Sequence, residues 1–212
     1  MIPLILKLKK ASHKEIAKAQ DIIIEALYHV FDRAVLHGGT SIWRCYQGNR
    51  FSEDIDVYLQ KDQSKLDIFF EALTSKGFKL LKKKISENSV YTNLEFARTI
   101  IRFEAVFKKA EGVLKEYQTS EGNLITIYTL SPEQLIKEKV HAYLNRCKIR
   151  DLYDIFFLLR YVKNKDAVKH ELPLLIDNFR QPVDKKELKV LIIEGLTPEI
   201  DKIKEYIKDF YS

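Results

Sequence analysis

Two aspartates separated by one residue, at the start of an apolar strand, constrain the fold of this chain more than any other feature. Asp54 and Asp56 begin a segment of alternating side chains that is predicted to be a β-strand. Strand side chains alternate between two faces, so Ser52 shares the face of the two aspartates. Ile55 and Val57 point the other way, into the core. Neighbouring carboxylates repel each other, and divalent cations that bind them together with phosphate oxygens relieve that repulsion.

A glycine pair precedes this strand. Gly38 and Gly39 follow a short apolar strand and lead into Thr40 and Ser41, which suit the N-cap of a short helix. The glycines let successive N–H groups converge, and a helix N-terminus adds partial positive charge, so a phosphate could bind there. Alone, such a pair is more often an ordinary turn, and Asp-x-Asp is more often a solvated strand edge. Their joint spacing, with Arg50 between them, favours a phosphate site beside a metal site.

These residues resemble a known family. Gly38-Gly39-Thr40, followed by Arg50-Phe51-Ser52-x-Asp54-Ile55-Asp56, resembles the first motif of the AbiEii/AbiGii-type toxin nucleotidyltransferases, a branch of the DNA polymerase β-like nucleotidyltransferase superfamily. The resemblance implies a toxin of a toxin–antitoxin or phage-defence system. It also implies Mg²⁺ or Mn²⁺ as cofactor, an NTP as substrate, the 3′ acceptor end of tRNA as an acceptor, and a cognate antitoxin as a further partner.

A third acid lies on another predicted strand, from Thr99 to Phe107. Glu104 resembles the third carboxylate that polymerase β-like enzymes carry beside their aspartate pair. It could equally be a structural acid on an exposed face, paired with Arg102 or with a lysine. Both interpretations remain open from the residues alone.

The later part of the chain adds charged residues at helical spacing. Lys139, Tyr143 and Arg146 are predicted to share the polar face of one helix. With Arg150-Asp151-x-x-Asp154 at the start of the next helix, they look like the later family motifs. Lys139 would then face the aspartate strand and meet the triphosphate, with Asp151 orienting it. Alternatively, Arg150 and Asp154 form a stabilising i, i+4 salt bridge, and Asp151 is a simple N-terminal helix charge.

The candidate site collects the residues with a predicted chemical role. The predicted metal ligands are Asp54, Asp56 and Glu104. The predicted catalytic residues are Asp54, Asp56, Glu104, Lys139 and Asp151. The predicted nucleotide-binding residues are Gly38, Gly39, Thr40, Ser41, Arg50, Ser52, Arg146 and Arg150.

The periodicity of the sequence changes near residue 130. The first part predicts a helix from a capping box over residues 12–15 through Phe31, a short helix that stops at Gly77, and a series of strands. Those strands are expected over residues 34–37, 54–59, 78–85, 91–96, 99–107, 113–118 and 124–129. Ser131-Pro132-Glu133 then starts a helix, a break follows over residues 145–149, and three short helices are expected beyond Lys163.

These patterns predict an α/β (α+β) protein with a mixed sheet and flanking helices, followed by a helical C-terminal half. We expect a nucleotidyltransferase core over residues 1–130. Residues 131–212 are expected to complete the active-site cleft.

The charge balance favours an anionic partner. The 212 residues include 36 Lys and Arg against 30 Asp and Glu, a net charge of +6, which suits RNA, DNA or a nucleotide. The lysines are scattered along the chain, however, and could serve solubility alone. Three of them, residues 82–84, end a predicted strand and are typical of a solvated sheet edge.

Cysteine usage and hydropathy indicate the compartment. Cys45 and Cys147 lack Cys-x-x-Cys spacing, which argues against a zinc site or a disulfide framework and fits a reducing cytosol. No apolar run approaches about 18 residues, and the N-terminal apolar stretch is too short for a signal peptide. We therefore expect a cytoplasmic protein without a membrane partner.

The predicted function is Mg²⁺-dependent transfer of nucleotides from an NTP, such as ATP, to RNA, with the 3′ end of tRNA as the first candidate acceptor. Two alternatives remain. The same chemistry could modify a protein side chain or a small-molecule hydroxyl. A catalytically silent nucleic-acid-binding module would also account for the basic charge.

Overall fold

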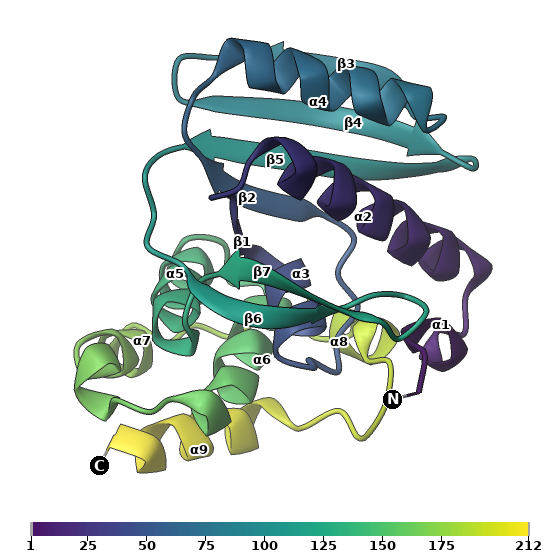
Figure 1. Ribbon diagram of the computed structural model, residues 1–212. Coiled ribbons are helices and arrows are strands. Elements are labelled where there is room, and N and C mark those ends of the chain that lie inside the picture. Colours follow the sequence, from purple (N-terminus) through teal and green to yellow (C-terminus); the bar gives the residue numbers. More distant parts are fainter. Residues whose placement is uncertain (1, 212) are drawn as a thin grey trace. The chain divides into compact units, whose positions relative to one another are not determined.

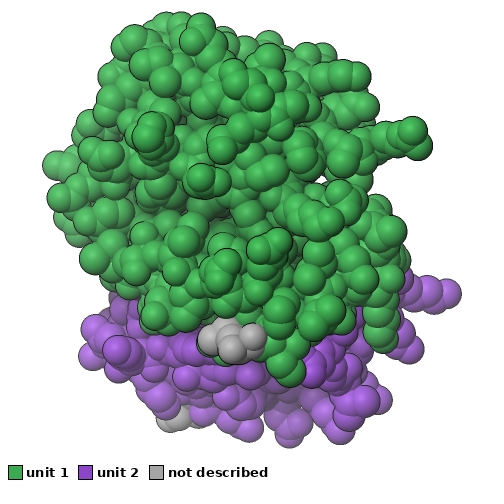
Figure 2. Space-filling view, turned by 45° about the vertical axis from the view of Figure 1, so that its right-hand side comes forward, with its two compact units in different colours: residues 1–47, 51–130 green, residues 48–50, 131–212 purple. Residues whose placement is uncertain are grey.

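A computed structural model describes residues 2–211 (Figure 1). The chain forms two compact units: residues 1–47 and 51–130 make the first, and residues 48–50 and 131–212 make the second (Figure 2). The first unit contains a mixed sheet with helices, and the second is mainly helical. The predicted α/β class, with flanking helices and a helical C-terminal half, is confirmed.

The sheet of the first unit has seven strands in the order β3-β4-β5-β2-β1-β7-β6. The pairs β2–β5 and β1–β7 are parallel, and the other neighbours are antiparallel. The predicted bounds of β5, β6 and β7 are confirmed residue for residue, and the lysine-rich β3 is an edge strand, as predicted. The strands are β1 (Val35–His37), β2 (Ile55–Leu59), β3 (Lys79–Ile85), β4 (Ser89–Phe96), β5 (Thr99–Phe107), β6 (Val113–Gln118) and β7 (Leu124–Thr129).

The two faces of β2, β4 and β5 differ sharply in burial. One face is covered by α2 (Ala11–Val30) and α4 (Gln63–Ser75) (Figure 1). Phe69 of α4 packs against Phe103 of β5 with ring centroids 5.1 Å apart, and both rings are fully buried. Each such side chain contributes about 1.5–3 kcal/mol of burial free energy. The other face carries half-buried polar side chains, and we call it the site face because Asp54, Asp56 and Glu104 belong to it.

Two local predictions in the first unit are wrong, and one short helix was not predicted. A short helix, α1 (Leu4–Lys7), was not expected. Helix α2 begins at Ala11 with Lys10 as its N-cap, so Ser12 lies inside the first turn and the capping box does not form. Helix α3 (Gly38–Cys45) begins at the glycine pair itself, so Thr40 and Ser41 are helical residues and not N-caps. Its N-cap is His37, which makes no side-chain cap.

In the second unit, the predicted helix start and the predicted helix break are both confirmed. Ser131 and Gln134 form a capping box, and Pro132 occupies the first turn, which confirms the predicted start of α5. Cys147 takes a left-handed conformation, with φ 50°, and ends α5 within the predicted break. The helical elements are α5 (Pro132–Arg146), α6 (Ile149–Leu158), α7 (Glu171–Asp177), α8 (Glu187–Leu191) and α9 (Ile200–Tyr211), with 3₁₀ turns η1 (Leu159–Tyr161) and η2 (Lys165–Val168).

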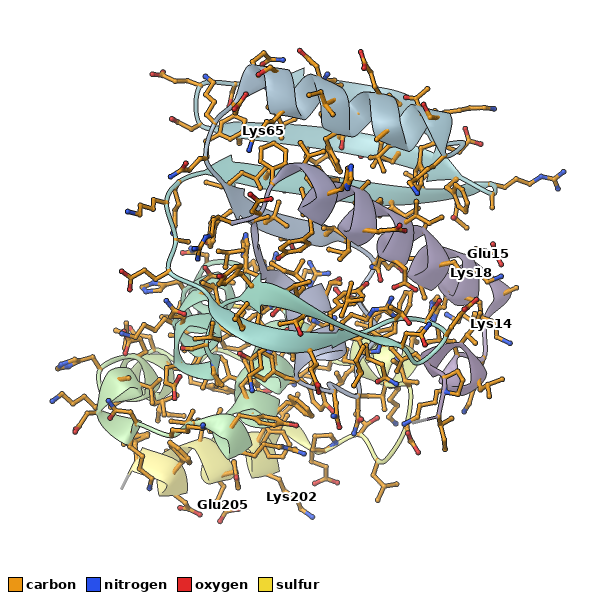
Figure 3. All side chains as sticks on the ribbon, viewed as in Figure 1. Lys14, Glu15, Lys18, Lys65, Lys202 and Glu205 are labelled. Atoms are coloured by element: carbon orange, nitrogen blue, oxygen red, sulfur yellow. The ribbon has the colours of Figure 1, made fainter. Side chains whose placement is uncertain are left out.

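The excess of positive charge is distributed over both units. Lys14, Lys65 and Lys202 lie on α2, α4 and α9 (Figure 3), and on α2 Lys18 pairs with Glu15 at 3.0 Å. Cys45 and Cys147 are buried free thiols, and burial raises the pKa of the Cys45 thiol to about 12. Within residues 2–211, no helix combines the length and apolar character needed to cross a membrane.

Candidate functional site

The sheet register brings the predicted carboxylates into one row on the site face. Asp56 of β2 is paired with Glu104 of the parallel strand β5. On its other side, Asp56 is paired with His37 of β1. Residues paired in this way point to the same face of a sheet, and their strands lie about 4.8 Å apart. Asp54, Asp56 and Glu104 are all half-buried, so their side chains lie on one face without being enclosed.

Asp54 has a side-chain partner, whereas Glu104 has none among the described residues. The guanidinium of Arg102 on β5 donates to the Asp54 carboxylate, and both side chains are partly exposed. The alternative that Glu104 is paired with Arg102 is therefore wrong. In the part of the chain that the structure describes, the Glu104 carboxylate makes no hydrogen bond or ion pair with another side chain. Glu104 is the candidate carboxylate that is available to a ligand.

Gly38, the first residue of the glycine pair, lies against Asp56 of β2. Its φ is +71°, a left-handed conformation that favours glycine. A Cβ at this position would overlap a carboxylate oxygen of Asp56 and lie 3.2 Å from its Cγ. Gly38 therefore permits the turn into α3 and lets the backbone approach Asp56 closely. The glycine pair and the Asp-x-Asp motif thus form one structural feature.

The hydroxyl groups after the glycine pair bind within the fold. Thr40 donates from Oγ1 to the carbonyl oxygen of Asp54. Ser41 shares a buried hydrogen bond with Thr129, whose Oγ1 donates to the carbonyl oxygen of Leu36 at 2.8 Å. Both predicted phosphate-binding hydroxyls therefore fix α3 to the sheet. The backbone N–H groups at the start of α3 remain the chemically suited anion donors of this segment.

Gln20 of α2 positions the loop before the aspartate strand. Its Nε2 donates to the carbonyl oxygens of Ser52 and Glu53 at 2.9 and 3.1 Å, and Gln20 is fully buried. The Ser52 side chain is itself buried. Neither Gln20 nor the Arg102–Asp54 pair was predicted from the sequence. A polar residue inside the apolar stripe of α2 was the signal that could have identified Gln20.

His37 continues the row of the site face onto β1. Its imidazole stacks on the ring of Tyr58, with centroids 3.9 Å apart and an interplanar angle of 4°. Lys108, which follows β5, places its Nζ 4.1 Å from the centroid of the same tyrosine ring. The Tyr58 ring thus provides an aromatic surface on the site face, two residues along β2 from Asp56.

The remaining candidate residues form an ion network inside the second unit. Arg50 makes two hydrogen bonds to Asp154, both at 2.8 Å. The Nζ of Lys139 lies 2.8 Å from Oδ2 of Asp154 and 3.3 Å from Oδ1 of Asp151. Arg146 binds both oxygens of Asp151 at 2.7 and 2.8 Å. We call these five residues the buried ion network, although the Arg146 side chain is 45% exposed.

The network corrects one prediction about α5 and rules out two alternatives about α6. Lys139 and Tyr143 are buried, so they do not form a polar stripe with Arg146. Asp154 pairs with Arg50 and Lys139, so the alternative of an i, i+4 bridge from Arg150 is wrong. Asp151 is not a simple helix charge, because it is fully buried and binds two cations. Asp151 does contact Lys139, as predicted. Arg150 is half-buried, and its guanidinium forms no ion pair within residues 2–211.

Electrostatics keeps Asp154 and Arg50 charged. Burial alone would raise the pKa of the Asp154 carboxyl, but Arg50 and Lys139 outweigh that effect and hold this pKa below its usual range. Burial alone would likewise lower the pKa of Arg50, and Asp154 reverses the direction and raises it. Each buried charge is therefore stabilised by an opposite charge at hydrogen-bonding distance.

The site face suits a hard divalent cation by its donor chemistry. Carboxylate oxygens are the ligands that Mg²⁺ and Mn²⁺ prefer, and Asp54, Asp56 and Glu104 supply them from adjacent strands. Among the described residues, no three His, Cys, Asp or Glu side chains already converge on one point. Arg102, which holds Asp54, gives a physical reason: the Asp54 carboxylate must leave this cation to join a ligand set.

Comparison with known proteins gives a consistent result. A family model described as "Nucleotidyl transferase AbiEii toxin, Type IV TA system" matches residues 23–206. The chain is similar to the structure of MenT4, a nucleotidyltransferase toxin from Mycobacterium tuberculosis, with 16% identity, a TM-score of 0.64, and coverage of 96% of this chain and 85% of MenT4. JHP933 from Helicobacter pylori is similar with 19% identity, a TM-score of 0.62, and coverage of 96% and 90%.

A more distant structure shares part of the fold. The antibiotic-resistance factor ANT(2'')-Ia has 10% identity, a TM-score of 0.51, and coverage of 77% of this chain and 92% of its own. No curated protein matches the sequence. At these identities the structural similarities show a common fold, and the family match extends over most of the chain.

Proposed function

Because this chain belongs to the AbiEii family of nucleotidyl transferase toxins of type IV toxin–antitoxin systems, we propose that it transfers a nucleotide from an NTP to RNA in a Mg²⁺-dependent reaction. The 3′ end of tRNA is the first candidate acceptor. One observation carries the proposal: Gly38 approaches Asp56 so closely that a side chain would overlap its carboxylate, and Asp56 is paired with Glu104. The glycine pair therefore adjoins the acidic row, the name we give to Asp54, Asp56 and Glu104.

Asp54, Asp56 and Glu104 would hold Mg²⁺ or Mn²⁺. When bound, the cation supplies positive charge against the phosphate oxygens of the NTP. Asp54 and Asp56 contribute negative charge that keeps the cation in place. Glu104, which lacks a side-chain partner among the described residues, either completes the ligand set or accepts the proton of the acceptor hydroxyl.

The glycine segment would hold the triphosphate. The N–H groups of Gly38, Gly39, Thr40 and Ser41 lie in the first turn of α3, where intrahelical partners are lacking and the helix dipole favours an anion. The hydroxyls of Thr40 and Ser41 fix this turn in position, because they bind the Asp54 carbonyl and Thr129. They therefore orient the N–H donors indirectly.

The buried ion network would act by positioning. Asp154 holds Arg50 and Lys139, and Asp151 holds Lys139 and Arg146. Arg50 and Lys139 are thus charges neutralised within their own unit. The more exposed cations, Arg146 and Arg150, remain the candidates for contact with substrate phosphates from this unit.

Charge and family support RNA as the acceptor. The net charge of +6 favours a polyanion over a neutral small molecule. A toxin of a toxin–antitoxin system is expected to have a cellular target and a cognate antitoxin, which we propose as a further partner.

The experiment that tests the proposal combines the protein with each labelled NTP in turn, Mg²⁺ and total cellular RNA. A gel then separates RNA from protein. We expect label in the RNA, concentrated at tRNA size, and no label when EDTA replaces Mg²⁺. Label on the protein, or on a small product, would favour the alternative acceptors. Absence of any transfer, with RNA still bound, would favour a silent nucleic-acid-binding module.

A further inference from the structure

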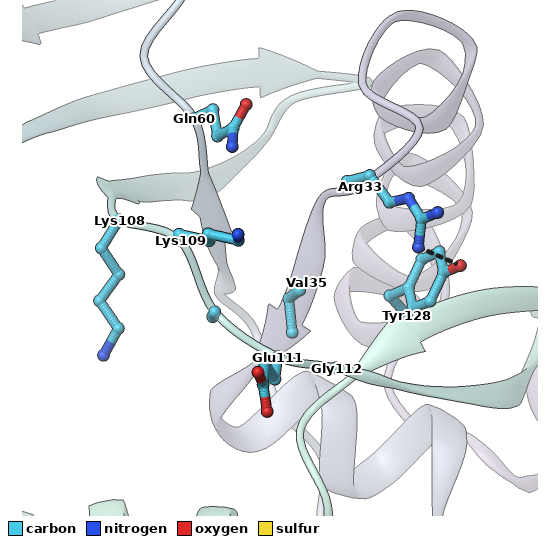
Figure 4. Close-up of a pocket in the computed structure, with 9 residues that line it drawn as sticks. Arg33, Val35, Gln60, Lys108, Lys109, Glu111, Gly112 and Tyr128 are labelled. Atoms are coloured by element: carbon cyan, nitrogen blue, oxygen red, sulfur yellow. Dashed lines mark hydrogen bonds between the residues drawn. The ribbon is translucent and has the colours of Figure 1, made fainter.

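A pocket of about 470 Å³ opens in the first unit, apart from the acidic row. Nine residues line it, from the ends of β1, β2, β5 and β7 and from the segment before β6 (Figure 4). Its volume suits a small ligand or one unit of a polymer. Its charged lining residues are Arg33, Lys108, Lys109 and Glu111.

The lining chemistry selects an anion. Three cationic side chains accompany one acid, and Gln60 and Tyr128 add polar groups. Arg33 donates to the Tyr128 hydroxyl at 2.7 Å, as Figure 4 shows. Its guanidinium carbon also lies 5.1 Å from the centroid of the Tyr128 ring. These two contacts orient the exposed guanidinium beside the pocket, where its remaining N–H groups suit a phosphate.

The register places this pocket on the site face. Val35, which lines it, is paired with Tyr58 of β2 and with Tyr128 of β7, so all three side chains point to the face of the acidic row. Val35 precedes His37 by two residues, so the pocket begins about 7 Å along the sheet from the acidic row. The ring of Tyr58 spans that interval, with His37 stacked on it and Lys108 close to it.

The pocket and the glycine segment lie at opposite ends of the same strands. Gly38 follows the C-terminal end of β1, whereas Arg33 precedes its N-terminal end. By register, Asp56 and Glu104 lie beside the glycine end of β1, and the pocket lies further along β1 on their other side. In phosphoryl transfer the attacking and leaving oxygens are roughly in line on opposite sides of the phosphorus. With the leaving pyrophosphate held at the glycine segment, an acceptor on the pocket side of Asp56 would lie roughly opposite it.

We propose that this pocket is the acceptor-side phosphate site, in which Arg33, Lys108 and Lys109 bind a backbone phosphate of the RNA close to its 3′ hydroxyl. The assignment rests on the proposed function. It adds an acceptor subsite in the first unit, with positive charge separate from the residues that hold the triphosphate.

The test is a Lys108→Gln/Lys109→Gln variant assayed with labelled NTP and total cellular tRNA. Both lysines are exposed, so the fold should persist. We expect the KM for tRNA to rise roughly tenfold, with kcat at saturating tRNA and the KM for NTP unchanged within about twofold. The log–log slope of tRNA affinity against salt concentration should become shallower by about 0.7 for each phosphate that the variant no longer neutralises.

Two matched variants isolate the cause. Lys108→Arg/Lys109→Arg keeps the charge and should restore most of the affinity for tRNA. Lys9→Gln/Lys10→Gln removes the same charge from an exposed lysine pair of the same unit, outside the pocket, and should raise the KM for tRNA by less than about twofold.

Three outcomes would overturn the assignment: an unchanged KM for tRNA, an equal rise of that KM in the Lys9→Gln/Lys10→Gln variant, or a rise in the KM for NTP instead. Failure of the proposed function is distinguished by the wild-type protein, which would then transfer no label to RNA. In that case, tRNA binding by fluorescence anisotropy still tests the pocket, and equal affinities of wild type and Lys108→Gln/Lys109→Gln would remove it.

Discussion

The two charged clusters of this protein use similar residues in opposite ways. On the site face, Asp54, Asp56 and Glu104 are half-buried and adjacent, and Glu104 has no side-chain partner among residues 2–211. In the buried ion network, the carboxylates of Asp151 and Asp154 are fully buried, and each binds two cations. The first cluster leaves the Glu104 carboxylate available for a ligand, whereas the second neutralises its own charge. The comparison predicts that substitutions in the network reduce stability, whereas those on the site face reduce activity.

The largest effect on stability is expected from Asp154→Asn. This change leaves Arg50 and Lys139 buried without their shared carboxylate, and breaking one side of a buried ion pair costs about 3–5 kcal/mol. Urea denaturation at pH 7 measures the free energy of unfolding. A destabilisation below about 1 kcal/mol would contradict the assignment of the network as a brace.

Lys139→Met should have the next largest effect. The thioether keeps the apolar stem, while Asp154 retains Arg50 and Asp151 retains Arg146. The destabilisation should therefore be smaller, about 1–3 kcal/mol. A thermal melt beside an NTP-binding titration separates stability from site function. A variant that melts like the wild type but binds NTP more weakly would move Lys139 from the brace to the nucleotide site.

Acid should weaken the network. The folded pKa of Asp154 lies below its unfolded value of about 3.9, so its stabilising contribution is complete above that value and is lost as the pH falls through the folded pKa. The difference in unfolding free energy between wild type and Asp154→Asn should shrink below about pH 4. Denaturant titrations of both proteins measure this difference, once at neutral pH and once at a pH below the pKa of Asp154 in the unfolded chain. A difference that stays constant would contradict a lowered pKa of Asp154.

Arg102→Gln should have the smallest effect on stability. Its pair with Asp54 is partly exposed, and such pairs contribute under about 1 kcal/mol. If Asp54 is a metal ligand, removal of the competing guanidinium should lower the Mg²⁺ concentration for half-maximal transfer. Activity measured across a Mg²⁺ series tests this. A destabilisation above about 2 kcal/mol would instead make Asp54 part of a structural pair.

Local patterns in the sequence predicted most of the sheet. Alternation over β5, β6 and β7 and the Ser131-Pro132 helix start depend on neighbouring residues, and they were confirmed. Two of the failed predictions depend on distant contacts. Asp154 binds Arg50, which is 104 positions away, so the spacing of Arg150 suggested the wrong partner. Ser41 likewise binds Thr129, 88 positions away, which no N-cap rule anticipates.

The arrangement of the acidic row was predicted from the sequence only in part. Period-two alternation correctly placed Asp54 and Asp56 on one face and Ile55 and Val57 on the buried one. The register that pairs Asp56 with Glu104 requires the parallel alignment of β2 and β5, which the residues of either strand do not specify. The close approach of Gly38 to Asp56 also appears only in three dimensions.

The most direct measurement compares label transfer from NTP to RNA by the wild type, Asp54→Asn and Asp56→Asn, with thermal melts of all three. Both aspartates are half-buried on the site face. The free energy of unfolding of each variant should therefore differ from that of the wild type by less than about 1 kcal/mol. Each should reduce transfer by about a thousandfold or more, because the charge that holds the cation is removed. Equal label incorporation by all three proteins would contradict the assignment of the acidic row as the catalytic centre.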